Sequence, residues 1–257
     1  MIHGACGNGS QFELLAGEAR IRGWSSKIIN LRYHGVPTSA VDEKDLGNIS
    51  ILEYADYVQE QVEKIGPCFL VGHSMGGLIA LKVAEMGGEN IMGVILMGSV
   101  APKGILFLSW PVLVRLPWYI KAFILKKTWK ISPAHARALI LNTTKPETAN
   151  RIIKNLVHES GLAGRQCAFA QIPIDKSRIK TKILVIAGGL DRMAPLRVQI
   201  KIANLFRAEF TSIEGSDHTM HCNDHWKSCA DVTLHWTESL ARDFIARQRI
   251  ISVPYRR

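Results

Sequence analysis

Short apolar runs alternate with amphipathic segments along most of the chain. Runs such as Ile91–Met97 are continuously apolar, which is typical of parallel strands that are covered on both faces. The segments between them repeat apolar positions every three to four residues, as helices do. This pattern predicts an α/β fold, a mostly parallel sheet flanked by helices. The expected strands are Lys27–Asn30, Cys68–Gly72, Ile91–Met97, Lys182–Ala187 and Ala208–Glu214, and the expected helices are Leu46–Ile65, Gly76–Met86, Leu196–Leu205 and Ala230–Arg247.

The alternation stops between Pro102 and Lys180, where three or four helices fit the pattern better than strands. Ser132 followed by Pro133 is typical of an N-cap with proline at the first helical position. Lys145-Pro146-Glu147 is a second start of this kind. We therefore predict an α/β core formed by residues 1–101 and 181–257, with a helical cap inserted at residues 102–180.

Composition and charge limit the class of protein. A chain of 257 residues with 47% hydrophobic and 21% charged residues suits one large globular domain with an insertion. It contains no run of 18 apolar residues and no recognisable leader, so a cytoplasmic protein without a spanning helix is expected. The five cysteines are scattered and form no CxxC pair, which favours free thiols.

Positive charge is concentrated in the predicted cap. Residues 101–180 contain 14 Lys and Arg against three acidic residues, a net charge of +11, whereas the whole chain carries +10. An anionic membrane surface, an anionic substrate or nucleic acid would explain this excess, as would a solvated helical face with no partner. No known nucleic-acid-binding signature accompanies the charge, so nucleic acid is not expected. An anionic head group of the substrate and peripheral contact with an anionic membrane both stay open.

The most specific motif is Gly72-His73-Ser74-Met75-Gly76-Gly77, which lies between a predicted strand and a predicted helix. G-x-S-x-G in this context is typical of a nucleophile elbow, a tight turn that exposes the serine hydroxyl. The amide of Met75, at the start of the helix, is a predicted oxyanion donor. We also expect His73 to contact substrate.

A serine nucleophile needs a base and an acid that orients the base. Asp191 and His218 each follow a predicted strand, and the carboxyl ends of parallel strands meet at one edge of a sheet. The alternatives are a helix N-cap for Asp191 and an ordinary surface-loop role for His218. The neighbouring His221 and His225 lack the spacing of a metal site, so we expect no metal and no cofactor; His225-Trp226 is expected to open the last helix.

A second oxyanion donor is expected from His3-Gly4-Ala5-Cys6-Gly7, through the amide of Ala5; the alternative is a glycine-rich tail without a role. The first part of the predicted cap is rich in aromatic and aliphatic residues. We expect it to line an acyl pocket, with Trp110 and Trp118 contacting substrate; packing on the core is the alternative.

Together these residues resemble the α/β-hydrolase superfamily, in its serine esterase and haloperoxidase-like branch with a helical cap. His3-Gly4 is similar to the family's oxyanion-loop HG, and Gly189-Leu190-Asp191-Arg192 to its G-x-x-D. Leu31–Gly35, with Ser39 beyond, resembles the D-x-R-G-H-G-x-S loop, and Tyr54–Val58 resembles Y-A-D-D-V. The chain departs from these patterns at Asn30, Tyr33 and Tyr57. The family also has two antiparallel strands and a full third strand before HG, which are largely missing here, so a poorly anchored oxyanion loop is expected.

The resemblance implies Ser74 as nucleophile, His218 as general base and Asp191 as the orienting acid. Serine at the elbow excludes haloalkane dehalogenase and epoxide hydrolase chemistry, because those branches use aspartate there. The expected activity is hydrolysis of a carboxylic ester or thioester with a hydrophobic acyl group, through an acyl-enzyme. A lactone or C–C hydrolase remains an alternative, as does a weakly active or inactive ligand-binding protein on the same fold.

Overall fold

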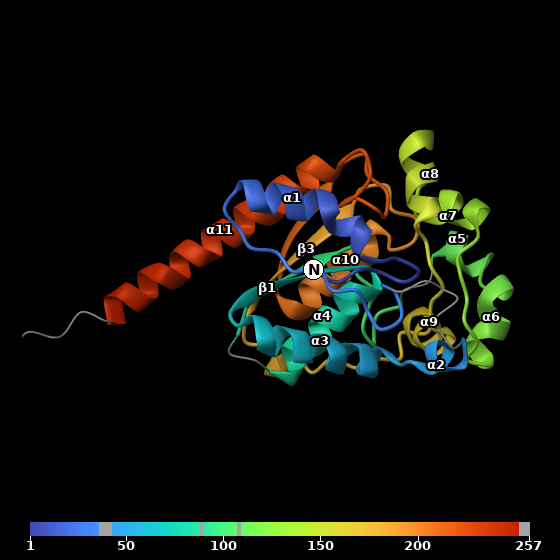
Figure 1. Ribbon diagram of the computed structural model, residues 1–257, viewed down its shortest axis with the longest axis horizontal. Coiled ribbons are helices and arrows are strands. Elements are labelled where there is room, and N and C mark those ends of the chain that lie inside the picture. Colours follow the sequence, from blue (N-terminus) through green and yellow to red (C-terminus); the bar gives the residue numbers. More distant parts are fainter. Residues whose placement is uncertain (36–42, 88–89, 107–108, 252–257) are drawn as a thin grey trace, which may run out of the picture.

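In the described part of the chain, the sheet consists of four parallel strands in the order β1-β2-β3-β4 (Figure 1). The computed structural model describes residues 1–35, 43–87, 90–106 and 109–251, with the backbone alone for 43 and 243–251. Each strand forms at an apolar run that was predicted to be a strand, because continuous apolar runs suit a sheet that is covered on both faces. The strands are β1 (Cys68–His73), β2 (Ile91–Met97), β3 (Lys182–Gly188) and β4 (Glu209–Ile213).

The N-terminal residues extend the sheet beyond β1 by single bridges. Ile2 pairs with Gly72 on one side and Ile29 on the other, both in parallel. The strand expected at Lys27–Asn30 is therefore reduced to one bridge. Ile2 is nevertheless held firmly, because its amide donates to Val71 at 2.8 Å and its carbonyl accepts from His73 at 3.0 Å. The expectation of a poorly anchored oxyanion loop is wrong for this reason.

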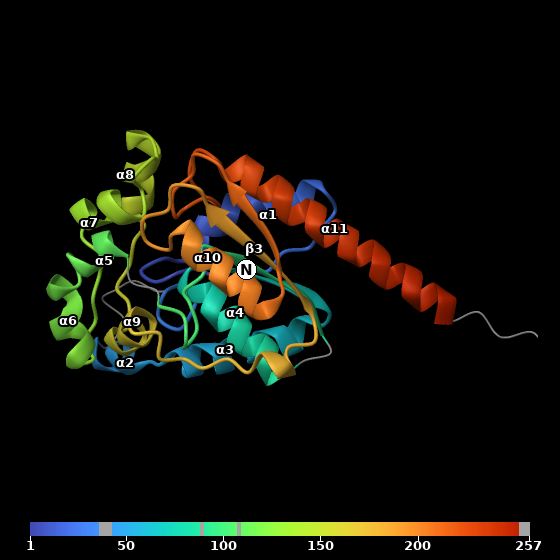
Figure 2. The ribbon, with the colours of Figure 1, turned by 180° about the vertical axis from the view of Figure 1, so that it is seen from behind.

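Helices cover both faces of the sheet (Figure 2). Along β2, Val94 and Leu96 belong to the core on one face, and Ile95 and Met97 to the core on the other. This alternation follows from the pleat of a strand. The first face is covered by α3 (Ile51–Ile65), α4 (Met75–Met86) and α10 (Leu196–Phe206), and the second by α1 (Glu13–Ile21), which was not predicted, and α11 (Trp226–Ile251).

The single helix expected at Leu46–Ile65 is two helices, α2 (Glu43–Asn48) and α3. Ser50 separates them as the N-cap of α3. Its hydroxyl accepts from the Glu53 amide at 3.2 Å, and the Glu53 carboxylate accepts from the Ser50 amide at 2.8 Å. This reciprocal capping box fixes a new helix start.

Between β2 and β3 the described residues form helices and no strand (Figure 1). There are five α-helices rather than three or four, each with proline in its first turn except the last. Ser132 caps the third as predicted, accepting from His135 at 3.2 Å. The helices are α5 (Trp110–Leu113), α6 (Pro117–Ile124), α7 (Pro133–Leu139), α8 (Pro146–Lys154) and α9 (Gly161–Ala168).

The structure also bears on the state of the cysteines and on membrane-spanning helices. All five cysteines are free. Within the part of the chain that the structure describes, no helix combines the length and apolarity needed to cross a bilayer.

Candidate active site

Ser74 occupies a sharp turn between β1 and α4. Its φ is 53°, a left-handed backbone conformation that residues other than glycine rarely adopt and that is found mainly where a site requires it. The Ser74 amide donates to Met97 at 2.9 Å, and its carbonyl accepts from Gly77 and Val100, both at 3.0 Å. The backbone of the turn is thus fixed independently of the hydroxyl, which is left available at the carboxyl edge of the sheet.

Two glycines make the turn possible. A Cβ on Gly72 would lie 2.3 Å from the carbonyl oxygen of Gly76, and a Cβ on Gly76 would lie 2.3 Å from that of Ile2. Both oxygens belong to the backbone, which cannot give way as the end of a flexible side chain can. The glycines of the G-x-S-x-G motif are therefore required by close backbone approach.

His218 and Asp191 are brought together from the loops after β4 and β3. The Nδ1 atom of His218 lies 2.7 Å from Oδ2 of Asp191, and both side chains are buried. The other carboxylate oxygen, Oδ1, accepts from the amides of Met193 and Ala194, each at 2.8 Å. The carboxylate is thus oriented by two amides and directs the Nδ1–H of the imidazole toward itself, which leaves Nε2 free of a proton.

His73 holds the backbone of the loop that carries His218. Its Nε2–H donates to the carbonyl oxygen of His218 at 2.9 Å. Burial, together with the imidazoles of His221 and His218, holds the pKa of His73 well below its usual value, so the ring is neutral. His73 also borders the cavity described below, and the structure adds a positioning role to the substrate contact predicted for it.

The two other histidines of this region differ in placement. His221 is buried between His73 and Phe12, with ring centroids 4.1 and 4.8 Å away, and burial lowers its pKa to about 3. His225 precedes α11, which begins at Trp226 as predicted. Among the described residues, no group of three or more His, Cys, Asp or Glu side chains is placed to hold a metal ion.

The loop His3–Gly7 lies against the elbow. A Cβ on Gly4 would lie 2.9 Å from Cβ of Ser74, which shows how closely the two backbones approach. His3 orders the loop, because its Nδ1 lies 2.9 Å from the Gly4 carbonyl oxygen and its Nε2 accepts from the Leu31 amide at 3.1 Å. Ala5 borders the same cavity as Ser74 and Met75. Met75 is the first residue of α4, so its amide has no partner within the helix.

The residues that depart from the family's D-x-R-G-H-G-x-S loop still order the backbone. Asn30, in place of the leading acid, accepts from the Gly9 amide at 2.7 Å. Tyr33, in place of a glycine, has a φ of 68°, the left-handed conformation that glycine favours. Ser39 lies outside the described residues.

A buried acid from the region between β2 and β3 fastens the loop His3–Gly7, and no sequence motif pointed to it. Glu159 accepts from the Tyr54 hydroxyl at 2.8 Å, from His34 Nε2 at 3.0 Å and from the Cys6 amide at 3.4 Å. Burial alone would raise the pKa of Glu159, but His34 lowers it. Burial alone would lower the pKa of His34, but Glu159 raises it. The two side chains therefore form a buried ion pair next to Ala5.

Replacing Glu159 by glutamine is expected to lower the free energy of unfolding by about 3–5 kcal/mol, because it leaves a buried cation without its counter-charge. The stability that the Glu159 carboxylate contributes is fully present above its unfolded pKa of about 4.5. It is lost as pH falls through the lowered pKa of the folded state. The His34 contribution is full below its unfolded pKa of about 6.5 and is lost as pH rises through the raised folded pKa. The loss should thus be largest between about pH 4.5 and 6.5.

Urea unfolding of wild type and variant at about pH 5.5 and about pH 9 measures this difference. Glu147→Gln, at an exposed position of α8, is the matched control and should cost less than about 1 kcal/mol. A loss of the same size at both pH values would contradict the ion pair.

A second acid, Asp217, ties the His218 loop to the segment between α7 and α8. Its Oδ2 accepts from the amides of Thr143 and Thr144, each at 3.0 Å, and from the Thr144 hydroxyl at 2.7 Å. Burial alone would raise the pKa of Asp217, but these hydrogen bonds lower it. Asp217 is committed to this structural role, so Asp191 is the acid that contacts the imidazole.

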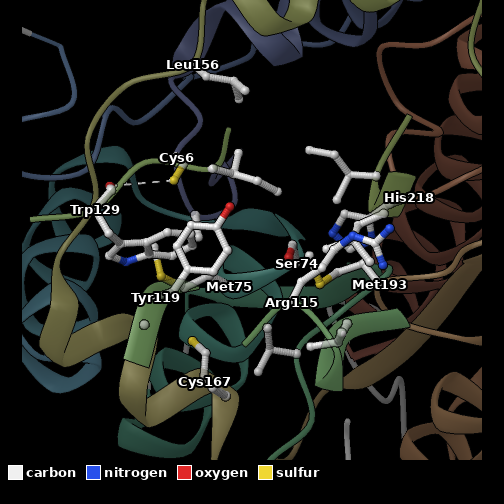
Figure 3. Close-up of a pocket in the computed structure, with 18 of the residues that line it drawn as sticks. Cys6, Ser74, Met75, Arg115, Tyr119, Trp129, Leu156, Cys167, Met193 and His218 are labelled. Atoms are coloured by element: carbon white, nitrogen blue, oxygen red, sulfur yellow. Dashed lines mark hydrogen bonds between the residues drawn. The ribbon is translucent and has the colours of Figure 1, made fainter. Parts of the chain in front are cut away.

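A cavity of about 130 Å³ opens at Ser74 and extends beneath the helices between β2 and β3 (Figure 3). Ser74 and His218 lie beside each other at one side of it, whereas Tyr119 and Trp129 lie across from them. Of the described residues that border it, Arg115 is the one charged side chain apart from histidines. The wall away from Ser74 is apolar and includes Leu116, Tyr119, Phe123, Trp129, Ile131, Leu139, Leu156 and Cys167.

Trp110 and Trp118 do not border this cavity. Their side chains are 74% and 70% exposed, and the ring of Trp118 packs edge-on against His135 on the outside. The expectation that they contact substrate is corrected accordingly. Their neighbours on the same helices, including Val112 and Tyr119, border the cavity instead; helical spacing turns one set inward and the other outward.

Comparisons with known proteins show the family and the fold of the chain. The model of the "Alpha/beta hydrolase family" matches residues 1–232. A putative 2-succinyl-6-hydroxy-2,4-cyclohexadiene-1-carboxylate synthase from Haemophilus influenzae is 38% identical over 77 residues. That match covers 28% of this chain and 29% of the synthase, so it spans less than a third of either protein.

Solved structures match over nearly the full length. A monoacylglycerol lipase from Paleococcus ferrophilus is 19% identical, with a TM-score of 0.71 and 93% of each chain covered. A methylesterase from Arabidopsis is 15% identical, with a TM-score of 0.70, covering 92% of this chain and 97% of its own. At these identities the likeness shows the fold alone.

Proposed function

Because the chain belongs to the alpha/beta hydrolase family, we propose that it is a serine hydrolase that cleaves carboxylic esters or thioesters of hydrophobic acyl groups. The observation that carries this proposal is the placement of Ser74 and His218 at one apolar cavity, with His218 Nδ1 held by Asp191 at 2.7 Å. A hydroxyl, an imidazole and a carboxylate in this order form the arrangement that activates a serine nucleophile. The esterase and lipase names of the structural neighbours support the same class of chemistry.

In the proposed mechanism, Nε2 of His218 takes the hydroxyl proton as Ser74 Oγ attacks the substrate carbonyl carbon. The negative charge that develops on the carbonyl oxygen is stabilised by the amides of Met75 and Ala5. Collapse of the tetrahedral intermediate breaks the bond to the leaving group, which receives the proton from His218. Water then enters, gives a proton to His218 and attacks the acyl carbon, and Ser74 recovers its proton as the acid is released.

The volume and the apolar lining of the cavity indicate which part of the substrate binds there. Its volume of about 130 Å³ is close to that of an engineered apolar cavity of ~150 Å³ that binds benzene, so it holds an acyl chain of roughly six carbons. Buried methylenes contribute about 0.8 kcal/mol each, which is about a fourfold gain in kcat/KM for each one. An uncharged acyl chain needs no charged side chain along the apolar wall of the cavity.

The activity profile over p-nitrophenyl acetate, butyrate, hexanoate and octanoate tests this proposal. We expect kcat/KM to rise by about fourfold per methylene up to hexanoate and then to level off. Acetate preferred over hexanoate would contradict the hydrophobic acyl pocket. No measurable hydrolysis of any of the four esters would favour the ligand-binding alternative.

Ala168→Leu is expected to shorten the preferred chain, because Ala168 borders the cavity and leucine fills part of it. Hexanoate hydrolysis should fall by about tenfold or more relative to acetate hydrolysis, as expected for two or three lost methylene sites. Ala138→Leu makes the same change on α7 at a residue that does not border the cavity, and the profile should stay unchanged. An equal loss for acetate and hexanoate in Ala168→Leu would show that the chain lies elsewhere.

A further inference from the structure

The outer side of helices α5 and α6 exposes a row of large apolar side chains. Single exposed apolar residues are common on protein surfaces, but a contiguous group marks a contact site. Trp110, Trp118 and Ile124 are 74%, 70% and 62% exposed. We call this group the outer cap face; it consists of Trp110, Leu113, Val114, Trp118, Ile124 and Leu125.

The two helices form a nearly continuous helical segment with an inward and an outward stripe. The amides of Arg115 and Leu116 both donate to Val112, and Trp118 donates to Arg115, so helical turns connect α5 to α6. Exposed apolar residues recur every three to four positions from Trp110 to Trp118 and again at Ile124 and Leu125, and the cavity-lining residues between them keep a three- to four-residue spacing. The inward stripe is Val112, Leu116, Tyr119 and Phe123, and the outward stripe is the outer cap face. This segment therefore separates the cavity from the exterior by the thickness of one helix.

Basic side chains accompany the outer cap face. Lys121 lies on α6 between Trp118 and Leu125 at helical spacing, and Lys126 and Lys127 follow directly. All three are exposed, and none forms an ion pair with a described residue. The sequence from residue 90 to residue 146 contains no Asp or Glu. Residues 90–146 therefore contribute positive charge and no negative charge to this side of the molecule.

We propose that the outer cap face docks on the surface of an anionic lipid bilayer. Tryptophan is the side chain most suited to the boundary between headgroups and acyl chains, and lysines beside it reach anionic headgroups. Apolar burial and electrostatic attraction then act together. Helix α6 lies at the edge of the molecule in both views, with α5 beside it (Figures 1 and 2), so a flat surface can approach α6.

Docking would place lipid acyl chains next to the helices whose inner stripe lines the cavity. The docking itself is independent of the proposed hydrolase function. Only the delivery of an acyl chain to Ser74 rests on the proposed hydrolase function.

Sedimentation with vesicles tests the docking without any turnover. Vesicles of phosphatidylcholine alone are compared with vesicles that also contain phosphatidylglycerol. We expect binding to the anionic vesicles only, weakening as salt is added. The double variants Trp110→Ala/Trp118→Ala and Lys121→Glu/Lys127→Glu should each lower the partition coefficient by about tenfold or more.

The matched controls remove an apolar side chain or reverse two charges at other places on the surface. Ile21→Ala removes an 81% exposed apolar side chain on α1, and Lys182→Glu/Lys201→Glu makes the same charge change at exposed positions of β3 and α10. Both controls should bind like wild type. Equal loss in the controls, equal binding to both vesicle types, or a dimer in sedimentation velocity that the tryptophan variant abolishes would each overturn the proposal. Ester hydrolysis by these proteins in the absence of vesicles reports separately on the proposed function.

Discussion

Replacing Ser74 by alanine is expected to lower kcat for ester hydrolysis by about 10⁵- to 10⁶-fold, because the nucleophile is removed while the rest of the site stays. The fold should be retained. The backbone of the turn is fixed by its hydrogen bonds to Met97, Gly77 and Val100, none of which uses the hydroxyl. Thermal unfolding of the variant should therefore occur within a few degrees of wild type.

The comparison is made with purified variants on p-nitrophenyl hexanoate. Ser228→Ala, at an exposed position of α11, removes a hydroxyl of the same kind and should leave kcat unchanged. Appreciable hydrolysis by folded Ser74→Ala would mean that another group performs the chemistry.

Replacing Asp191 by asparagine is expected to lower kcat by about 10⁴-fold. The amides of Met193 and Ala194 donate to Oδ1, so the asparagine must place its own oxygen there and its NH₂ group toward His218. Nδ1 of His218 then has to accept, which leaves the ring proton on Nε2. An imidazole in that tautomer cannot take the proton from Ser74.

Asp217→Asn is the control for this variant, because Asp217 is the neighbouring acid in the histidine loop. Its carboxylate holds Thr143, Thr144, Thr219 and Asn223 rather than the imidazole. We expect it to destabilise the fold while costing far less activity than Asp191→Asn. The reverse order of the two activities would assign the orienting role to Asp217.

The sheet and the elbow were predictable because their signals are local. A continuous apolar run such as Ile91–Met97 is a strand in the structure with the same bounds. The glycines around Ser74 are dictated by the close approach of neighbouring backbone. Asp191 and His218 follow consecutive strands, and parallel strands deliver their ends to one edge.

The rest depended on contacts that sequence spacing does not encode. His34 and Glu159 lie 125 positions apart and pair only in the folded chain. Apolar composition indicated that the first cap helices face a pocket, yet it could not show that Trp110 and Trp118 point outward while Val112 and Tyr119 point inward. Ile29 looked like part of a strand, but only a single bridge to Ile2 forms there.

The proposed mechanism depends on activation of the Ser74 hydroxyl by His218 and Asp191. Incubation with a fluorophosphonate probe, followed by intact-mass and peptide mapping, measures this directly. We expect one adduct on Ser74 in the wild-type protein, none in Ser74→Ala, and strongly slowed labelling in His218→Ala. A folded wild-type protein that stays unlabelled, or an adduct that persists in Ser74→Ala, would contradict it.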